Sequence, residues 1–137
     1  MGELTLTWLQ DTYPIYSLEI AKQADGPQIE ELLSSLRTNI EQYDRVQYIA
    51  TFDHYTHTSN QSDGEIAADI KDARNLVFCV GRSLPSPLAP ALRPRSIGVV
   101  ETDQKFVISF MQAPMQLANQ IMTDCVEQLE NSFAKTT

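Results

Sequence analysis

Apolar and polar residues alternate along the segment Tyr13–Ala21, where Tyr16, Leu18 and Ile20 are separated by polar side chains. An alternation with a period of two residues is typical of a β-strand that buries one face. The pattern therefore predicts a half-buried strand near the start of the chain.

The next apolar residues recur at three- and four-residue steps, the spacing of one face of an α-helix. They are Ile29, Leu32, Leu33, Leu36, Ile40 and Tyr43. Asp25 and Pro27 come just before them. An aspartate can cap the free N–H groups of a helix, and proline suits the first helical position. We therefore expect an amphipathic helix that begins near Pro27.

Four further short segments are rich in β-forming residues. They are Val46–Phe52, Leu76–Gly81, Ile97–Glu101 and Phe106–Phe110. The second is apolar on both faces, which predicts an inner strand. The last two are expected to form a hairpin in which the side chains at 106, 108 and 110 share one face. Residues 66–73 fit either a short helix or an irregular connection.

Four of the seven prolines lie between residues 82 and 95. Proline lacks an N–H donor and has a fixed φ, which excludes a regular strand there. Because Leu88 and Leu92 make this loop too apolar for a solvated linker, we expect it to pack back onto the domain, with one helical turn.

The final helix is expected to begin at Pro114. Its apolar stripe is broad: Leu117, Ile121, Cys125, Leu129 and Phe133, widened by Ala118, Met122 and Val126. Such a face either covers a sheet or partly meets another subunit. The element order predicts one α+β domain over residues 1–137. It is a two-layer domain, with a mainly antiparallel sheet and two main helices packed on one face.

Composition narrows the class of protein. The 137 residues are 42% apolar and 20% charged, as in a folded globular domain, and the net charge is -8. An acidic protein repels phosphate groups, so we expect neither nucleic-acid nor membrane binding. Two separated cysteines, Cys79 and Cys125, form no disulfide framework or zinc motif. With no export signal in the sequence, we expect a cytoplasmic protein.

The charge is unevenly distributed along the chain. Residues 73–100 contain no acid but hold Arg74, Arg82, Arg93 and Arg95, so this segment carries +4 and the remainder -12. Arg93 and Arg95 flank Pro94, and the planar guanidinium group suits a carboxylate or a phosphate. The alternative is an internal salt bridge to an acid such as Asp53, Asp69 or Asp72.

The two histidines form the second candidate, Asp53-His54-Tyr55-Thr56-His57. Histidine titrates near neutral pH and binds metals. Three roles stay open: a hydrogen-bonded structural loop, a ligand or acid–base site, and a metal site. A metal would need further ligands from Asp53, Asp63, Glu65, Asp69 or a thiol.

The acids at positions 65, 69 and 72 would share a face if that segment were helical. They would then form either a cation site or a solvated surface paired with Lys71 and Arg74. The sequence contains no Gly-x-Ser-x-Gly motif and no glycine-rich phosphate loop, so it supports neither nucleophilic nor nucleotide chemistry.

Several of these segments together resemble a family of small uncharacterised bacterial proteins. The similar segments lie between residues 12 and 115, and the most specific are Phe52-Asp53-His54-Tyr55-x-His57-Thr58 and Arg93-Pro94-Arg95-Ser96-Ile97-Gly98-Val99. The layout is also similar to a broader class of uncharacterised bacterial α+β domains, although Val-Gly-Arg-Ser follows the third strand in place of that class's Asn-Pro. The resemblance implies an antiparallel sheet with helices on one face, and a dimer. It transfers no activity.

Taken together, the residues suggest a homodimer that binds a small anionic ligand, with the proline-rich loop as a partial lid. The expected ligand-binding residues are Asp53, His54, His57, Arg93 and Arg95. Two alternatives remain: a metal-dependent enzyme using the two histidines, and a protein-interaction module using the last helix. The sequence identifies no reaction and no cofactor.

Overall fold

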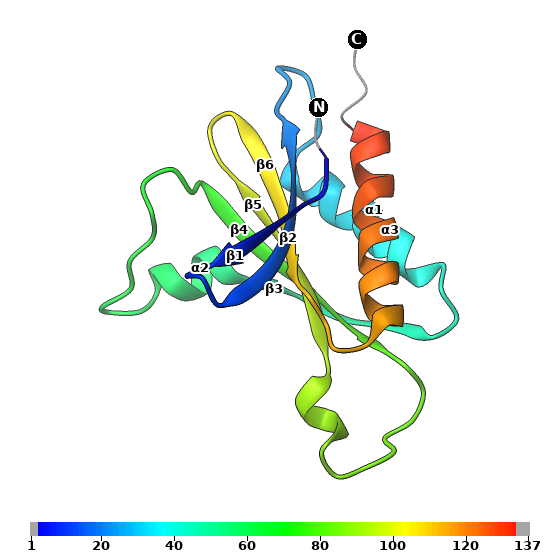
Figure 1. The fold of residues 1–137 in the computed structure, drawn as a ribbon. Coiled ribbons are helices and arrows are strands. Elements are labelled where there is room, and N and C mark those ends of the chain that lie inside the picture. Colours follow the sequence, from blue (N-terminus) through cyan, green and yellow to red (C-terminus); the bar gives the residue numbers. More distant parts are fainter. Residues whose placement is uncertain (1–2, 134–137) are drawn as a thin grey trace.

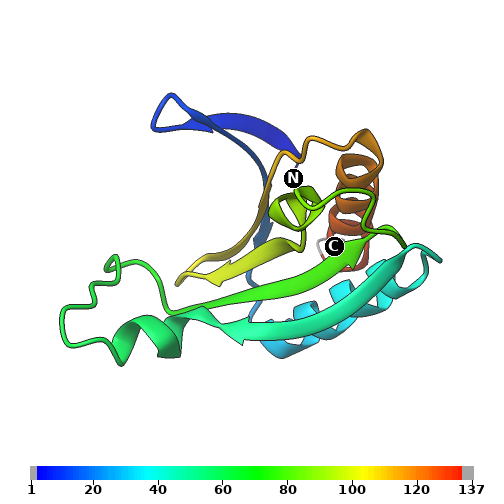
Figure 2. The same ribbon diagram turned by 90° about the horizontal axis from the view of Figure 1, so that it is seen from below.

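The computed structural model describes residues 3–133 as one six-stranded sheet with two long helices on one face (Figures 1 and 2). The elements are β1 (Thr5–Leu9), β2 (Tyr13–Ala21), α1 (Ile29–Glu41), β3 (Val46–Asp53), α2 (His54–Ser59), β4 (Asp72–Val80), the 3-10 turn η1 (Ala89–Leu92), β5 (Arg95–Glu101), β6 (Lys105–Met111) and α3 (Gln116–Phe133). The strand order is β1-β2-β6-β5-β4-β3, and all neighbours are antiparallel. The expected two-layer α+β fold is confirmed.

The apolar stripe predicted for α1 forms one half of the helical layer. Its five aliphatic residues from Ile29 to Ile40 are all buried. The helix begins two residues later than expected, because Gln28 rather than Asp25 precedes the first turn. The Gln28 backbone N–H donates to Glu31 Oε1 at 2.8 Å, so a side chain within the helix satisfies one free donor.

The inner face of the sheet supplies the rest of the core. Each inner strand contributes alternate buried residues: Leu18, Ile20, Leu76, Phe78, Val80, Ile97, Val99, Phe106, Ile108 and Phe110. Helix α3 packs on them through Ala118, Ile121, Met122, Cys125, Val126 and Leu129. The broad stripe of α3 therefore covers the sheet. Leu117, which was expected within the stripe, is 46% exposed.

The opposite face of the sheet carries a line of small polar residues across five strands. Asn75 pairs with Gly98, Gly98 with Ser109, Ser109 with Ser17, and Ser17 with Thr5. We call these five residues the polar row. In β4, β5, β6 and β2 they alternate with the buried residues of the strand, so they lie on the face turned away from α1 and α3.

The structure decides one connection that the sequence left open, and it contains one strand that was not predicted. Strand β4 begins at Asp72, and residues 66–71 form an irregular connection rather than a helix. The acids at 65, 69 and 72 therefore share no helical face. The edge strand β1 was not predicted, and all five of its residues are exposed. Residues 4–8 do alternate between apolar and polar types, so the strand is visible in the pattern, but its apolar side chains remain exposed at the edge of the sheet.

The proline-rich loop only partly packs back onto the domain. It contains the single helical turn η1, as expected, and Ala89 is buried. Leu84 and Leu88, in contrast, are 68% and 78% exposed. The rigid prolines hold these leucines in solvent because they prevent the loop from folding flat against the sheet.

Because Phe78 is buried and Leu88 is exposed, removing each side chain should change the free energy of unfolding by very different amounts. Phe78→Ala removes a fully buried ring between the sheet and the helices, and we expect it to lower the free energy of unfolding by about 3–5 kcal/mol. Leu88→Ala, the exposed control, should change it by less than about 0.5 kcal/mol. Urea denaturation measures both values, and a comparable loss in both variants would contradict this packing.

Candidate functional site

The two histidines lie where β3 passes into α2. His54 Nδ1 is 2.8 Å from Asn75 Oδ1, within hydrogen-bonding distance. The Phe52 ring lies beside both imidazoles, with centroid distances of 5.0 Å to His54 and 5.3 Å to His57. Both histidines are exposed. The aromatic contacts and the Asn75 bond orient the imidazoles, and they leave the other ring nitrogen of His54 facing solvent.

Asp53 has a structural role beside the histidines. Its carboxylate accepts hydrogen bonds from the Thr56 backbone N–H at 3.0 Å and from Thr56 Oγ1 at 2.9 Å, so it caps α2. These bonds, with a smaller contribution from the Arg74 charge, lower the pKa of Asp53. Both carboxylate oxygens are occupied, and Asp53 therefore differs from the expected free ligand-binding group.

Arg74 is the partner of the acids that the sequence offered to Arg93 and Arg95. Its guanidinium binds Asp72 at 2.9 Å and lies 3.7 Å from Asp53 and 3.5 Å from Glu30. The hydrogen bond to Asp72 raises the pKa of Arg74, which stays charged. This ion cluster ties β4 to the start of α2 and to α1.

Arg93 and Arg95 brace the proline-rich loop through backbone carbonyls. Arg93 Nη1 donates to Ser83 O at 2.5 Å. Its guanidinium lies against Gly81, where a Cβ atom would be 3.3 Å from Arg93 Cζ and where φ is +108°. Arg95 Nη2 donates to Met111 O at 3.1 Å. Among the described residues, neither arginine forms a salt bridge to a carboxylate.

The structure does not bring the histidines and these arginines together. Asp53 pairs with Arg74 on β4, whereas Arg95 pairs with Phe78, four residues further along the same strand. Four residues of a strand span about 13 Å. This separation along β4 gives no support to one shared site or to a loop that closes over the histidines.

The metal alternative receives no geometric support. Within residues 3–133, no three His, Cys, Asp or Glu side chains are placed to hold a metal ion. Cys125 is buried in the core, and burial raises the pKa of its thiol to about 12, which keeps it protonated. Cys79 lies four residues from Asn75 along β4, so it is not adjacent to His54.

The polar row begins at Asn75, beside His54, and crosses the face of the sheet that α1 and α3 leave uncovered. A Cβ atom built on Gly98 would lie 3.7 Å from both Asn75 Nδ2 and Ser109 Oγ. Glycine therefore leaves room between two side chains that can donate hydrogen bonds. Neither atom bonds to another residue in the described part of the chain. Sequence reasoning missed this row, because its members lie far apart in the chain and meet only through strand register.

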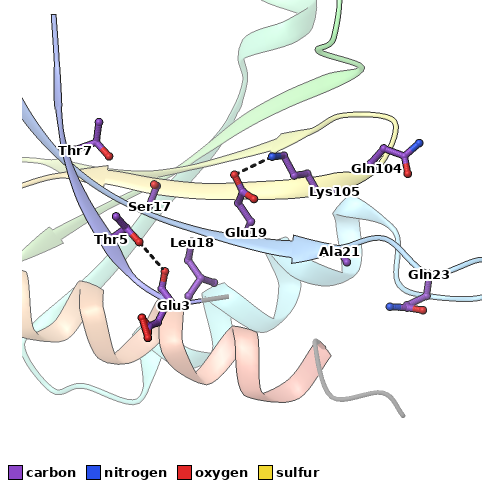
Figure 3. A pocket seen from close by; sticks show the side chains of 10 residues that line it. All are labelled: Glu3, Thr5, Thr7, Ser17, Leu18, Glu19, Ala21, Gln23, Gln104 and Lys105. Carbon is purple, nitrogen blue, oxygen red and sulfur yellow. Dashed lines mark hydrogen bonds and ion pairs between the residues drawn. The ribbon is translucent and has the colours of Figure 1, made fainter. Parts of the chain in front are cut away.

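At its far end, the row borders a hollow of about 860 Å³ (Figure 3). Thr5, Thr7 and Ser17 line it with hydroxyl groups. Lys105 Nζ and Glu19 Oε2 form an ion pair at 2.9 Å beside them. Lys105 thus neutralises the charge of Glu19, and the hollow is a polar surface on β1, β2 and β6.

The Asp53 cap predicts a pH-dependent contribution to stability. Because the pKa of Asp53 is lowered in the fold, its contribution is complete above the unfolded value of about 3.9 and is lost as the pH falls through the folded value. Asp53→Asn keeps a capping oxygen but removes the charge. We expect it to melt earlier than wild type at pH 7, with the gap closing in acid. Asp63→Asn, in the exposed turn after α2, is the control, and a gap independent of pH would contradict the assignment.

Comparison with known proteins gives a family without a described activity. No curated protein and no solved structure matches this chain. None of its described helices has the length and apolar character needed to cross a bilayer. One family model matches residues 4–131, nearly the whole chain, and is described as a family of unknown function. The chain therefore belongs to the family of unknown function DUF6858.

Proposed function

We propose that this protein binds a small ligand with an acidic group on the uncovered face of the sheet, beside His54 and Asn75. The observation that carries the proposal is Gly98, whose lack of a side chain leaves Asn75 Nδ2 and Ser109 Oγ on either side of the position that a Cβ atom would take, each 3.7 Å from it. The ligand's carboxylate or phosphate would accept hydrogen bonds from these donors. The site differs from the expected one, because His54 contributes and the two loop arginines do not.

The His54–Asn75 hydrogen bond supports this role. The hydrogen bond between His54 Nδ1 and Asn75 Oδ1 also fixes the Asn75 amide, so that Asn75 Nδ2 is held as an oriented donor. A donor that is already oriented loses little conformational entropy when a ligand binds. Asn75 then holds the imidazole through Oδ1 while its Nδ2 group donates to the ligand.

Residues on either side of the polar row favour a ligand with an apolar body. Val77 lies two residues from Asn75 on β4, and Val100 and Val107 pair with each other across β5 and β6. All three are half-buried. Binding sites for small molecules combine such apolar walls with a few polar groups. An aromatic or aliphatic acid would satisfy both.

Gly98→Val tests this site without disturbing the core. The valine side chain would fill the space over Gly98. The strand should tolerate it, because the new Cβ meets its neighbours at ordinary contact distances of 3.7–3.8 Å. We expect benzoate and inorganic phosphate to shift the backbone amide NMR signals of Asn75, Gly98 and Ser109 in the wild type. Gly98→Val should weaken that binding at least about tenfold, or about 1.4 kcal/mol.

Ser96→Val is the matched control, because it adds the same side chain on the same face and strand outside the polar row. It should bind as the wild type does. Benzamide, which has the ring of benzoate without its charge, should bind more weakly than benzoate. Signals that shift only around Arg93 and Arg95 would refute the proposed site.

A homodimer is the second part of the proposal, supported by the edge strand β1. Its residues are uncharged, and Leu6, Trp8 and Leu9 are 41%, 55% and 53% exposed. An exposed edge strand without charge or proline is a template for pairing. Antiparallel pairing of β1 with its copy is self-complementary, and the neutral strand allows two acidic molecules to approach.

Trp8→Glu should convert this dimer to a monomer, since the new charges face each other across a two-fold axis. Gln10→Glu adds the same charge in the turn after β1 and should leave the dimer intact. Light scattering over a concentration series measures the mass of each variant. A monomeric wild type at every concentration would exclude the dimer.

A further inference from the structure

The positive charges of the protein fall into two groups, those paired with a carboxylate and those that are not. Every lysine among residues 3–133 forms an ion pair with a carboxylate, as do Arg37 and Arg74. The arginines that form no such pair within these residues are Arg45, Arg82, Arg93 and Arg95. These four arginines therefore take no part in the ion pairs of the fold, although the protein has a net charge of -8.

All four arginines surround the proline-rich loop. Gly81 N donates to Arg45 O at 2.7 Å, which places Arg45 where the loop leaves β4. Arg82 Nη2 donates to Asp44 O at 3.2 Å. Arg93 and Arg95 lie where the loop ends and β5 begins, and their guanidinium groups donate to backbone carbonyls. Arg45 and Arg82 are exposed, so their guanidinium groups can reach a partner, whereas the other two mainly add positive charge.

The same loop carries the most exposed apolar side chains of the described chain. Leu84 and Leu88 are 68% and 78% exposed, and Leu92 is 41% exposed. Prolines hold the backbone between them, so a partner would order few residues on binding. We call these three leucines with the four arginines the arginine end; the loop lies at the bottom of Figure 1.

We propose that the arginine end binds a protein segment in which aspartate or glutamate residues are interspersed with large apolar residues. Arginine forms bidentate hydrogen bonds with carboxylates. Protein interfaces are enriched in arginine and depleted of lysine, which matches the sorting of the two residue types here. The leucines would supply the apolar centre of the interface, and Arg45 and Arg82 would pair with acids around it.

An anionic membrane is the competing occupant, and charge argues against it. The four arginines of the arginine end carry +4, and the rest of the chain carries -12, so a flat anionic surface would repel most of the molecule. A short acidic segment touches only the arginine end and avoids that repulsion.

Selection of displayed random twelve-residue peptides on the intact protein tests the proposal. We expect the enriched peptides to be acidic and apolar. In fluorescence anisotropy, Arg45→Glu/Arg82→Glu should weaken binding of the strongest peptide at least tenfold, and Leu84→Ser/Leu88→Ser should do so independently. These residues are exposed, and circular dichroism verifies that both variants fold. Lys71→Glu, a charge reversal away from the loop, should change binding less than twofold.

Four results would overturn the proposal. Enriched peptides without an acidic excess, or no enrichment at all, would show that the arginines do not select acids. Peptides that bind both double variants normally would lie elsewhere on the molecule. Sedimentation with phosphatidylcholine–phosphatidylserine vesicles, if abolished by Arg45→Glu/Arg82→Glu, would assign the surface to a membrane. Peptides displaced by benzoate would instead belong to the polar row.

Discussion

The packing of α1 and α3 against one face of the sheet is the constraint on which the other features depend. Alternate residues of each inner strand enter the core with Phe78, Phe106 and Ile108. The intervening residues must then point to the opposite face, since successive side chains of a strand alternate. Neither α1 nor α3 covers that face, and the short helix α2 meets it only beside β4. The polar row exists because small polar residues occupy positions that the core does not use.

The length of β4 separates the two candidate surfaces. The histidines sit near its first residues, and the arginine end follows its last residue, Val80. Strong pairing on both sides holds β4 straight between them, with β3 and β5 as its neighbours. A ligand small enough for the space over Gly98 cannot span this distance. The histidines and the loop arginines therefore lie at different positions along β4, and the two proposed binding surfaces are separate.

Charge pairing decided the roles of individual residues. Asp53 and Asp72 are adjacent to Arg74 across β3 and β4, so Arg74 takes both acids. That leaves Arg93 and Arg95 to bind backbone carbonyls of the loop and of residues 111–112. Such choices among several equivalent partners depend on distance in space, and the order of charges along the chain does not reveal them.

Local periodicity in the sequence determined the elements that bury a face: the strand at 13–21, the stripe of α1, the hairpin of β5 and β6, and the α3 stripe apart from Leu117. Burial requires a regular apolar pattern, and that pattern is readable without coordinates. Only the tertiary structure decided the rest. Strand β1 buries no face, α2 begins through a cap made by Asp53, and the polar row and the arginine end assemble residues from separate strands. Contacts between distant segments depend on strand register and on the paths of loops, which a single chain's local pattern does not specify.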